Sequence, residues 1–193
     1  TTEIYTLSLH DALPILSRPG IVHRIDMNTT GVLVTCKNDF SHSRIAAQLA
    51  VHDITRKYNA IVWNPFSVES GTVDAPLARS RKDRKKVAID QSGRRAVTHY
   101  RVLENFKQFA HVECQLETGR THQIRVHMSS IGHPLLGDDV YGSGKSPYNI
   151  TGQALHARVL GFVHPRTGKY MEFEAPLPDY FQKILNDLES NGR

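Results

Sequence analysis

The segment AHVECQLE, residues 110–117, alternates apolar and polar side chains and constrains the fold more than any other stretch. Successive side chains of a β-strand point to opposite faces, so this pattern predicts a strand with one buried and one solvated face. Val112, Cys114 and Leu116 would line the buried face. Sheets built from such strands are usually antiparallel, and their apolar face must be covered by other elements.

Several other segments are rich in β-branched and aromatic residues and have the pattern of strands. We predict strands at 31–36, 54–63, 71–77, 86–90, 96–104, 155–164 and 169–176. The turn sequence QSGRR should join 86–90 to 96–104 as a hairpin, and PRTG should join the last two strands.

Three segments, 41–50, 121–132 and 178–190, have the spacing of amphipathic helices. Ser41 is the candidate N-cap of the first helix, and Gly132 would end the second. The apolar face of the last helix would carry Phe181, Ile184, Leu185 and Leu188. Together these elements predict an α+β fold with a mixed, mostly antiparallel sheet and short flanking helices.

The chain has 193 residues, which favours one domain, and its 39% of hydrophobic residues suffices for a buried core. We expect this domain to cover 17–193. Residues 1–16 fit poorly with the rest and lack the basic region and the cleavage site of a signal peptide. We expect them to be a leader foreign to the domain or a fragment end.

The two cysteines, Cys36 and Cys114, are too few for a disulfide scaffold and do not form a CxxC pair. A reducing compartment, most simply the cytoplasm, is therefore the expected location. No apolar run approaches the roughly 20 residues that span a bilayer, so we expect no membrane association.

The formal net charge of +5 and the pI of about 9.3 favour a polyanionic partner, most often a nucleic acid. The segment ARSRKDRKK places six cations within eight residues. They are Arg79, Arg81, Lys82, Arg84, Lys85 and Lys86. This basic segment is either a solvated loop or a surface that contacts phosphates.

The stretch HRIDMNTTG, residues 23–31, places Asp26 two residues after Arg24 and ahead of turn-type residues. A carboxylate in this position could act as a nucleophile, a general base, a metal ligand or a cap of the local turn. A second polar cluster, 117–142, contains Gln123 and Arg125 at helical positions that should pack inward. An Arg guanidinium can bind both oxygens of a carboxylate, although a purely structural ion pair is the alternative.

Other catalytic classes lack their sequence signals. His122 and His127 are spaced i, i+5, which does not place them on one helical face, and no HExxH motif is present, so no metal site is predicted. No GxSxG nucleophile elbow occurs, and GSGK at 142–145 lacks the spacing and the preceding strand of a phosphate-binding loop.

HRIDMNTTGVLVTCKND resembles the catalytic motif of the RluA-type pseudouridine synthase family. TRKYNAIV resembles the second motif of this family, LETGRTHQIRVHMSSIGHPLLGDDVYG the third, and QALHARVLGFVHPRTG the closing segment. GTVDAPLAR and AVTHYRVLE also resemble the branch that includes the large-ribosomal-subunit synthase D. The motifs occur in family order and extend from about Arg18 to Leu188.

The resemblance implies a role for each matching residue. Asp26 would be the catalytic carboxylate, Tyr58 would stack on the target base, and Arg125 would pair with Asp26. Arg24 would fill the space that the flipped uridine leaves. RNA contacts are implied for the basic residues Arg79, Arg81, Lys82, Arg84 and Lys85 and for Arg120, His122 and Gln123.

The implied function is isomerisation of uridine to pseudouridine in structured RNA, with large-subunit ribosomal RNA favoured and transfer RNA open. The implied reaction needs neither a cofactor nor an obligate protein partner. Family members have strands ahead of the first motif, and many have an RNA-binding S4 domain. The resemblance therefore implies a catalytic domain that is incomplete at its N-terminal side and lacks an S4 domain. An RNA-binding module without activity is the alternative, and a metal-dependent nuclease is disfavoured because the ligand spacing is missing.

Overall fold

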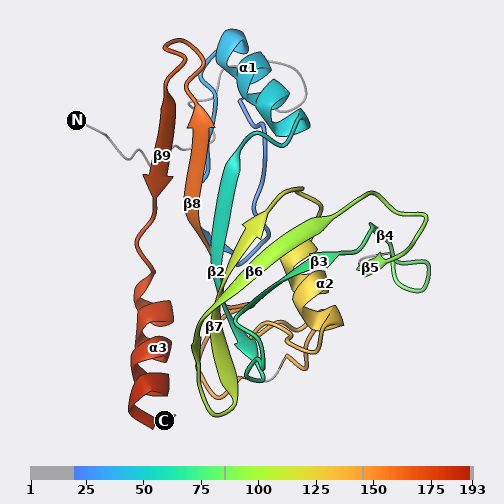
Figure 1. Cartoon of the computed structure of the whole chain (residues 1–193), viewed down its shortest axis with the longest axis vertical. Helices are drawn as coiled ribbons and strands as arrows, with labels where there is room; N and C mark the ends of the chain where they lie inside the picture. The colour runs from blue at the N-terminus through green and yellow to red at the C-terminus, as the bar shows by residue number, and fades with distance from the viewer. Residues whose placement is uncertain (1–19, 85, 145, 192–193) are drawn as a thin grey trace.

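The computed structural model describes residues 20–84, 86–144 and 146–191, which form a long twisted sheet with helices against it (Figure 1). The strands are β1 (Thr30–Gly31), β2 (Thr55–Trp63), β3 (Ser70–Asp74), β4 (Leu77–Arg79), β5 (Val87–Ile89), β6 (Val97–Asn105), β7 (Phe109–Leu116), β8 (Leu155–Val163) and β9 (Tyr170–Glu174). The helices are α1 (Asp39–Ala50), α2 (Gln123–Ser130) and α3 (Asp179–Asn191). The expected leader at 1–16 lies outside the described residues.

Seven strands form the main sheet in the order β1-β8-β2-β7-β6-β3, and β9 pairs with the second half of β8. Among the strands of the described residues, the contact between β1 and β8 is the only parallel one. Strands β4 and β5 form a separate antiparallel pair that projects from the side of the main sheet (Figure 1). This arrangement confirms the predicted α+β class with a mostly antiparallel sheet.

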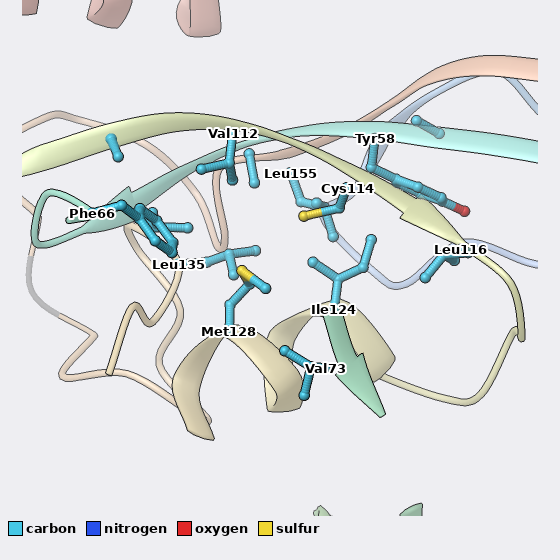
Figure 2. Close-up of a cluster of buried hydrophobic side chains, with 14 residues drawn as sticks. Tyr58, Phe66, Val73, Val112, Cys114, Leu116, Ile124, Met128, Leu135 and Leu155 are labelled. Carbon is cyan, nitrogen blue, oxygen red and sulfur yellow. The ribbon is translucent and has the colours of Figure 1, made fainter. Parts of the chain in front are cut away.

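Helix α2 packs on one face of the sheet. Met128 and Ile124 of this helix point towards Val112 and Cys114 of β7, with Tyr58 at the edge of the same cluster (Figure 2). The alternation predicted for β7 is thus confirmed, and burial of these side chains removes apolar surface from water.

Helix α3 covers the opposite face of the sheet. Its predicted apolar residues are buried there together with Ile61 of β2 and Phe109 of β7. They are Phe181, Ile184, Leu185 and Leu188. Neighbouring residues of β2 therefore pack into two different hydrophobic clusters, one beneath α2 and one beneath α3. This alternation places the strand between the two helices. In the described part of the chain, no helix has the length and apolar character to cross a membrane.

The predicted strand at 31–36 is wrong beyond Gly31. The N–H of Val32 still donates to the carbonyl of Ala157 at 2.9 Å, but β9 occupies the edge of β8 from Val159 onwards. The chain therefore leaves the sheet, and Val32 and Val34 pack into a side cluster around α1.

The helix predicted at 41–50 begins earlier, at Asp39, and its N-cap is Asn38 rather than Ser41. The N–H of Ser41 donates to Oδ1 of Asn38 at 2.9 Å, so Ser41 is the third helical residue. The helix predicted at 121–132 is also shorter, because His122 has a left-handed φ of 55° and the helical residues are Gln123–Ser130.

The predicted hairpin between 86–90 and 96–104 is wrong. Gly93 N–H does donate to the carbonyl of Asp90 at 2.8 Å, so a turn forms there. However, both edges of β6 are occupied by β3 and β7, and β5 pairs with β4 instead. The strand predicted at 71–77 accordingly divides before Pro76, and Leu77 begins β4.

Candidate active site

A cavity of about 360 Å³ lies where three distant segments meet: 21–29, the start of β2, and the loop that leads into α2. Six residues predicted for catalysis or RNA binding line it. They are Arg24, Asp26, Tyr58, Arg120, His122 and Gln123. The structure thus brings half of the twelve predicted residues together around one cavity, although they are separated by up to about one hundred positions.

Asp26 is placed by a turn. The N–H of Thr29 donates to the carbonyl of Asp26 at 3.0 Å, and Asn28 adopts a left-handed φ of 67°, which Asn tolerates better than most residues. The buried amide of Gln153 donates to the carbonyl of Met27 at 2.7 Å and to Oγ1 of Thr29 at 2.9 Å. The turn is therefore anchored to the body of the protein, and the Asp26 side chain is 16% exposed.

Arg125 lies between two carboxylates. Its Nη1 is 3.6 Å from Oδ2 of Asp26, while Nε and Nη2 donate to the two oxygens of Asp138 at 2.7 and 2.9 Å. Asp138 is the closer partner, and the sequence prediction did not include it. The Asp138 side chain is fully buried and the Arg125 side chain is 6% exposed, so this is an interior, charge-assisted pair.

Two backbone amides complete the binding of Asp138, since the N–H groups of Val140 and Tyr141 donate to its Oδ1. Burial opposes ionisation of Asp138, but these bonds and those from Arg125 outweigh it and lower the pKa of the carboxyl. Burial likewise opposes the charge of Arg125, and Asp138 with Asp26 more than compensates, raising the Arg125 pKa.

Tyr58 belongs both to the core and to the cavity wall. Its side chain packs in the cluster beneath α2, and Ile25 packs against this cluster from the side of Asp26. Burial raises the pKa of the Tyr58 hydroxyl, although the neighbouring Arg56 opposes this shift. A neutral ring fixed at the cavity edge is suited to stacking on a base.

His122 and Tyr141 connect the cavity to the β4–β5 pair. Nδ1 of His122 and the Tyr141 hydroxyl share a hydrogen bond of 2.7 Å, and the same hydroxyl accepts from the N–H of Val87 at 2.9 Å. Arg125 lies over the Tyr141 ring at 5.1 Å from its centroid. Burial is the main cause that lowers the pKa of His122.

Gln123 supports the loop that precedes α2. Its Oε1 accepts from Oγ1 of Thr118 and from the N–H of Arg120, and its Nε2 donates to Val97 and Thr98. The amide is thus fully occupied by the protein, and a direct contact of Gln123 with RNA stays a prediction.

The described residues of the basic segment do not line the cavity. Arg79 ends β4, and the exposed side chains of Arg81, Lys82 and Arg84 follow on the connection to β5. Arg81 forms an exposed ion pair with Asp90 at 3.7 Å. Lys85 lies outside the described residues.

The two histidines considered as metal ligands have different surroundings. His127 is fully buried and hydrogen-bonds to Thr98 and to the carbonyl of Ala75, whereas His122 faces the cavity. Within residues 20–84, 86–144 and 146–191, no group of three or more His, Cys, Asp or Glu side chains is placed to hold a metal ion.

The sequence profile of the RNA pseudouridylate synthase family matches residues 5–130. The chain belongs to this family. The match spans the segments that supply Asp26 and Tyr58 to the cavity and Arg125 to its contact with Asp26.

Similar proteins support this assignment. YlyB of Bacillus subtilis (strain 168), an uncharacterised RNA pseudouridine synthase, is 55% identical over 175 residues, which cover 91% of this chain and 57% of that protein. The ribosomal large subunit pseudouridine synthase D of Zymomonas mobilis is 51% identical over 187 residues, or 92% of this chain and 59% of the relative. The predicted family and its synthase D-like branch are thereby confirmed.

The fold is also similar to that of human RNA pseudouridylate synthase domain containing 4. The TM-score is 0.73 at 26% identity, over 90% of this chain and 77% of the human one. The chain spans about three fifths of the length of the curated bacterial relatives that it matches.

Three residues at this family site were not predicted from the sequence: Arg56, Asp138 and Tyr141. Asp138 and Tyr141 lie in GDDVYG, a stretch that resembles the third family motif, but nothing in its pattern indicated which acid would turn inward. Arg56 lies two residues before Tyr58, and the alternation of β2 was the one signal that could have placed both on the cavity side.

Proposed function

We propose that the protein isomerises uridine to pseudouridine within RNA, with Asp26 as the catalytic carboxylate. In this reaction the bond from N1 to C1′ breaks, the uracil turns, and C5 bonds to C1′. The hydrogen on C5 leaves as a proton, and N1 gains one, so that substrate and product are isomers and no redox partner is needed. The observation that carries the proposal is a cavity lined by Asp26 and Tyr58, with Arg125 placed behind Asp26 at 3.6 Å.

The residues around the cavity suit each step. Cleavage of a glycosidic bond develops positive charge at the sugar, and a carboxylate is the group that stabilises it. Asp26 either adds to C1′ or removes the 2′ proton. Arg125, held by Asp138, fixes the orientation of the Asp26 carboxylate from the protein side.

The target base must leave its stack to reach this cavity, which costs a few kcal/mol. Stacking on Tyr58 would return about 1–3 kcal/mol. Arg24 is exposed at the cavity and is the candidate to occupy the vacated space in the RNA.

We propose large-subunit ribosomal RNA as the substrate because relatives at 44–51% identity are named ribosomal large subunit pseudouridine synthase D. Transfer RNA remains the second candidate substrate, and no protein partner is proposed. A cytoplasmic location is supported by the two cysteines, which are both buried and unpaired.

Release of tritium from RNA labelled at C5 of uridine tests the proposal, because only the isomerisation liberates that hydrogen. We expect Asp26→Asn to abolish release while RNA binding, measured by fluorescence anisotropy, survives. Asp39→Asn, at the start of α1, is the matched control and should keep wild-type release. An Asp26→Asn variant that still converts uridine would refute the assignment, and RNA binding without release by the wild type would favour the binding-module alternative.

A further inference from the structure

Arg56 is a buried cation that forms no ion pair with any residue that the structure describes. It lies on β2, two residues before Tyr58, so both side chains face the cavity. Arg56 is 7% exposed, and among the described residues no carboxylate lies within 4.0 Å of its guanidinium. Its Nη2 donates to the carbonyl of Glu117 at 3.4 Å, and its buried Nε has no partner.

Arg125 gives the comparison within the same site. The two arginines are almost equally buried, at 5% and 7% exposure, yet Arg125 is bound by Asp138 and approached by Asp26. Buried charges in proteins are normally paired, because an isolated one loses its hydration without compensation. Burial accordingly lowers the pKa of Arg56, and the nearby charge of Arg120 lowers it further, although Tyr58 opposes the shift.

The cavity as a whole has an excess of positive charge. Its described lining includes Arg24, Arg56 and Arg120, and Asp26 is the one acidic residue among them. Since Asp26 already lies beside Arg125, it cannot neutralise the other three. An anionic group is therefore the kind of ligand that this part of the cavity would attract.

The loop before α2 leaves room for Arg56. A Cβ placed on Gly119 would lie 2.3 Å from Nη1 of Arg56, so only glycine permits the observed position of the guanidinium. Gln123 fixes this loop through Thr118 and the N–H of Arg120 on either side of Gly119. A side chain at position 119 would therefore displace the Arg56 guanidinium from the place that it takes beside this loop.

We infer that Arg56 binds a phosphodiester group of the RNA next to the uridine that enters the cavity. The guanidinium offers several N–H donors in one plane, which matches two oxygens of a phosphate. In the observed position Nη1, which lies beside Gly119, is the donor available for it, since the unpartnered Nε is buried. This inference rests on the proposed function, because it takes RNA as the molecule in the cavity.

Binding of a short uridine-containing RNA, measured in the Asp26→Asn background, tests the inference without turnover. In two further RNAs, a neutral methylphosphonate replaces the phosphate on the 5′ or the 3′ side of the target uridine. We expect one of these replacements to weaken binding about tenfold when Arg56 is present, and to have little effect after Arg56→Gln. Arg101→Gln, an exposed arginine paired with Glu113, is the control and should keep the full penalty.

Gly119→Ala provides a second variant, which retains the charge of Arg56 but displaces its guanidinium. In this variant too, the methylphosphonate should have little effect on RNA binding. Inorganic phosphate should displace the RNA more effectively from the protein that retains Arg56 than from the Arg56→Gln variant. The inference is overturned if each methylphosphonate weakens RNA binding by the same factor in the Arg56→Gln protein as in the protein that retains Arg56. It is also overturned if the RNA does not bind at all. If the methylphosphonate weakens binding only when Arg56 is present, but the protein with Asp26 releases no tritium, the phosphate site is supported and the proposed isomerisation is rejected.

Discussion

Asp138 and Asp139 are adjacent and chemically identical, yet they differ completely in environment. Asp138 is 1% exposed and binds Arg125 through both oxygens, whereas Asp139 is exposed. Removing one partner of a buried ion pair leaves an uncompensated charge and costs about 3–5 kcal/mol. We therefore expect Asp138→Asn to lower the free energy of unfolding by about this amount and to reduce tritium release, because Arg125 loses its anchor.

Chemical denaturation monitored by circular dichroism measures this change. Asp139→Asn is the matched control and should stay within about 0.5 kcal/mol of the wild type. Arg125→Met should be at least as harmful, since it leaves the buried Asp138 without its cation. Equal stability of the two Asp variants would show that the pair with Arg125 contributes nothing to folding.

The same pair of aspartates shows what sequence reasoning can predict for single residues. Motif resemblance located Asp26, Tyr58 and Arg125, and the structure places all three around one cavity or in contact with a residue that lines it. It did not locate Asp138, because the partner of a buried charge is decided by tertiary contacts between residues with no fixed spacing. Neighbouring identical side chains carry no local signal of which one turns inward.

At the scale of single elements, the contact between β2 and β7 includes a titratable side chain, that of His111. The side chain of His111 in β7 forms a hydrogen bond with that of Asn59 in β2, with 2.7 Å between Nε2 and Nδ2, and its ring lies against Phe181 of α3. Because an amide nitrogen only donates, the imidazole accepts this bond and must be neutral at Nε2. Burial lowers the pKa of His111 from 6.5 to about 4, although Glu113 opposes the shift.

The lowered pKa of His111 predicts how stability depends on pH. Between pH 6.5 and about 4, the unfolded chain binds a proton at His111 that the folded protein excludes. Folding stability from this group is therefore complete above pH 6.5 and declines as the pH falls through that window. We expect His111→Gln, whose amide oxygen can still accept from Asn59, to reduce the slope of unfolding free energy against pH there. Parallel curves for the variant and the wild type would contradict this prediction.

Element positions were easier to predict than element partners. The alternation of β7 and the apolar face of α3 follow from side-chain spacing, which is a local property. The pairing of β5 with β4 could not be obtained that way, because the choice depends on β3 and β7 already occupying both edges of β6. In the same way β9 excludes the segment after Gly31 from the edge of β8.

At the scale of the whole molecule, the basic segment and the cavity occupy different parts of the protein. The β4–β5 pair projects from the sheet (Figure 1), and it is joined to the site through Lys86 Nζ, which donates to the carbonyl of Val140 at 3.0 Å, and through the bond from Val87 to Tyr141. The segment can therefore supply affinity for RNA without touching the reacting base.

This separation predicts that affinity and chemistry respond differently to the charge of the segment. Replacing the exposed residues Arg81, Lys82 and Arg84 together by Gln removes three cations and should weaken RNA binding. Each lost phosphate contact reduces the slope of log affinity against log salt by about 0.7 to 0.9. We expect the slope to fall by about 2 to 3, while tritium release at saturating RNA stays within about twofold of the wild type.

A control variant with the same change in net charge separates a local contact from a general charge effect. Arg44, Arg166 and Lys169 are exposed and do not line the cavity, and their replacement by Gln also lowers the formal net charge from +5 to +2. If phosphates contact the β4–β5 connection itself, this control keeps most of the salt slope, because screening confines charge effects to about 10 Å at 0.1 M salt. Equal losses in both triple variants would mean that RNA senses only the overall charge, and the basic segment would then be a solvated loop.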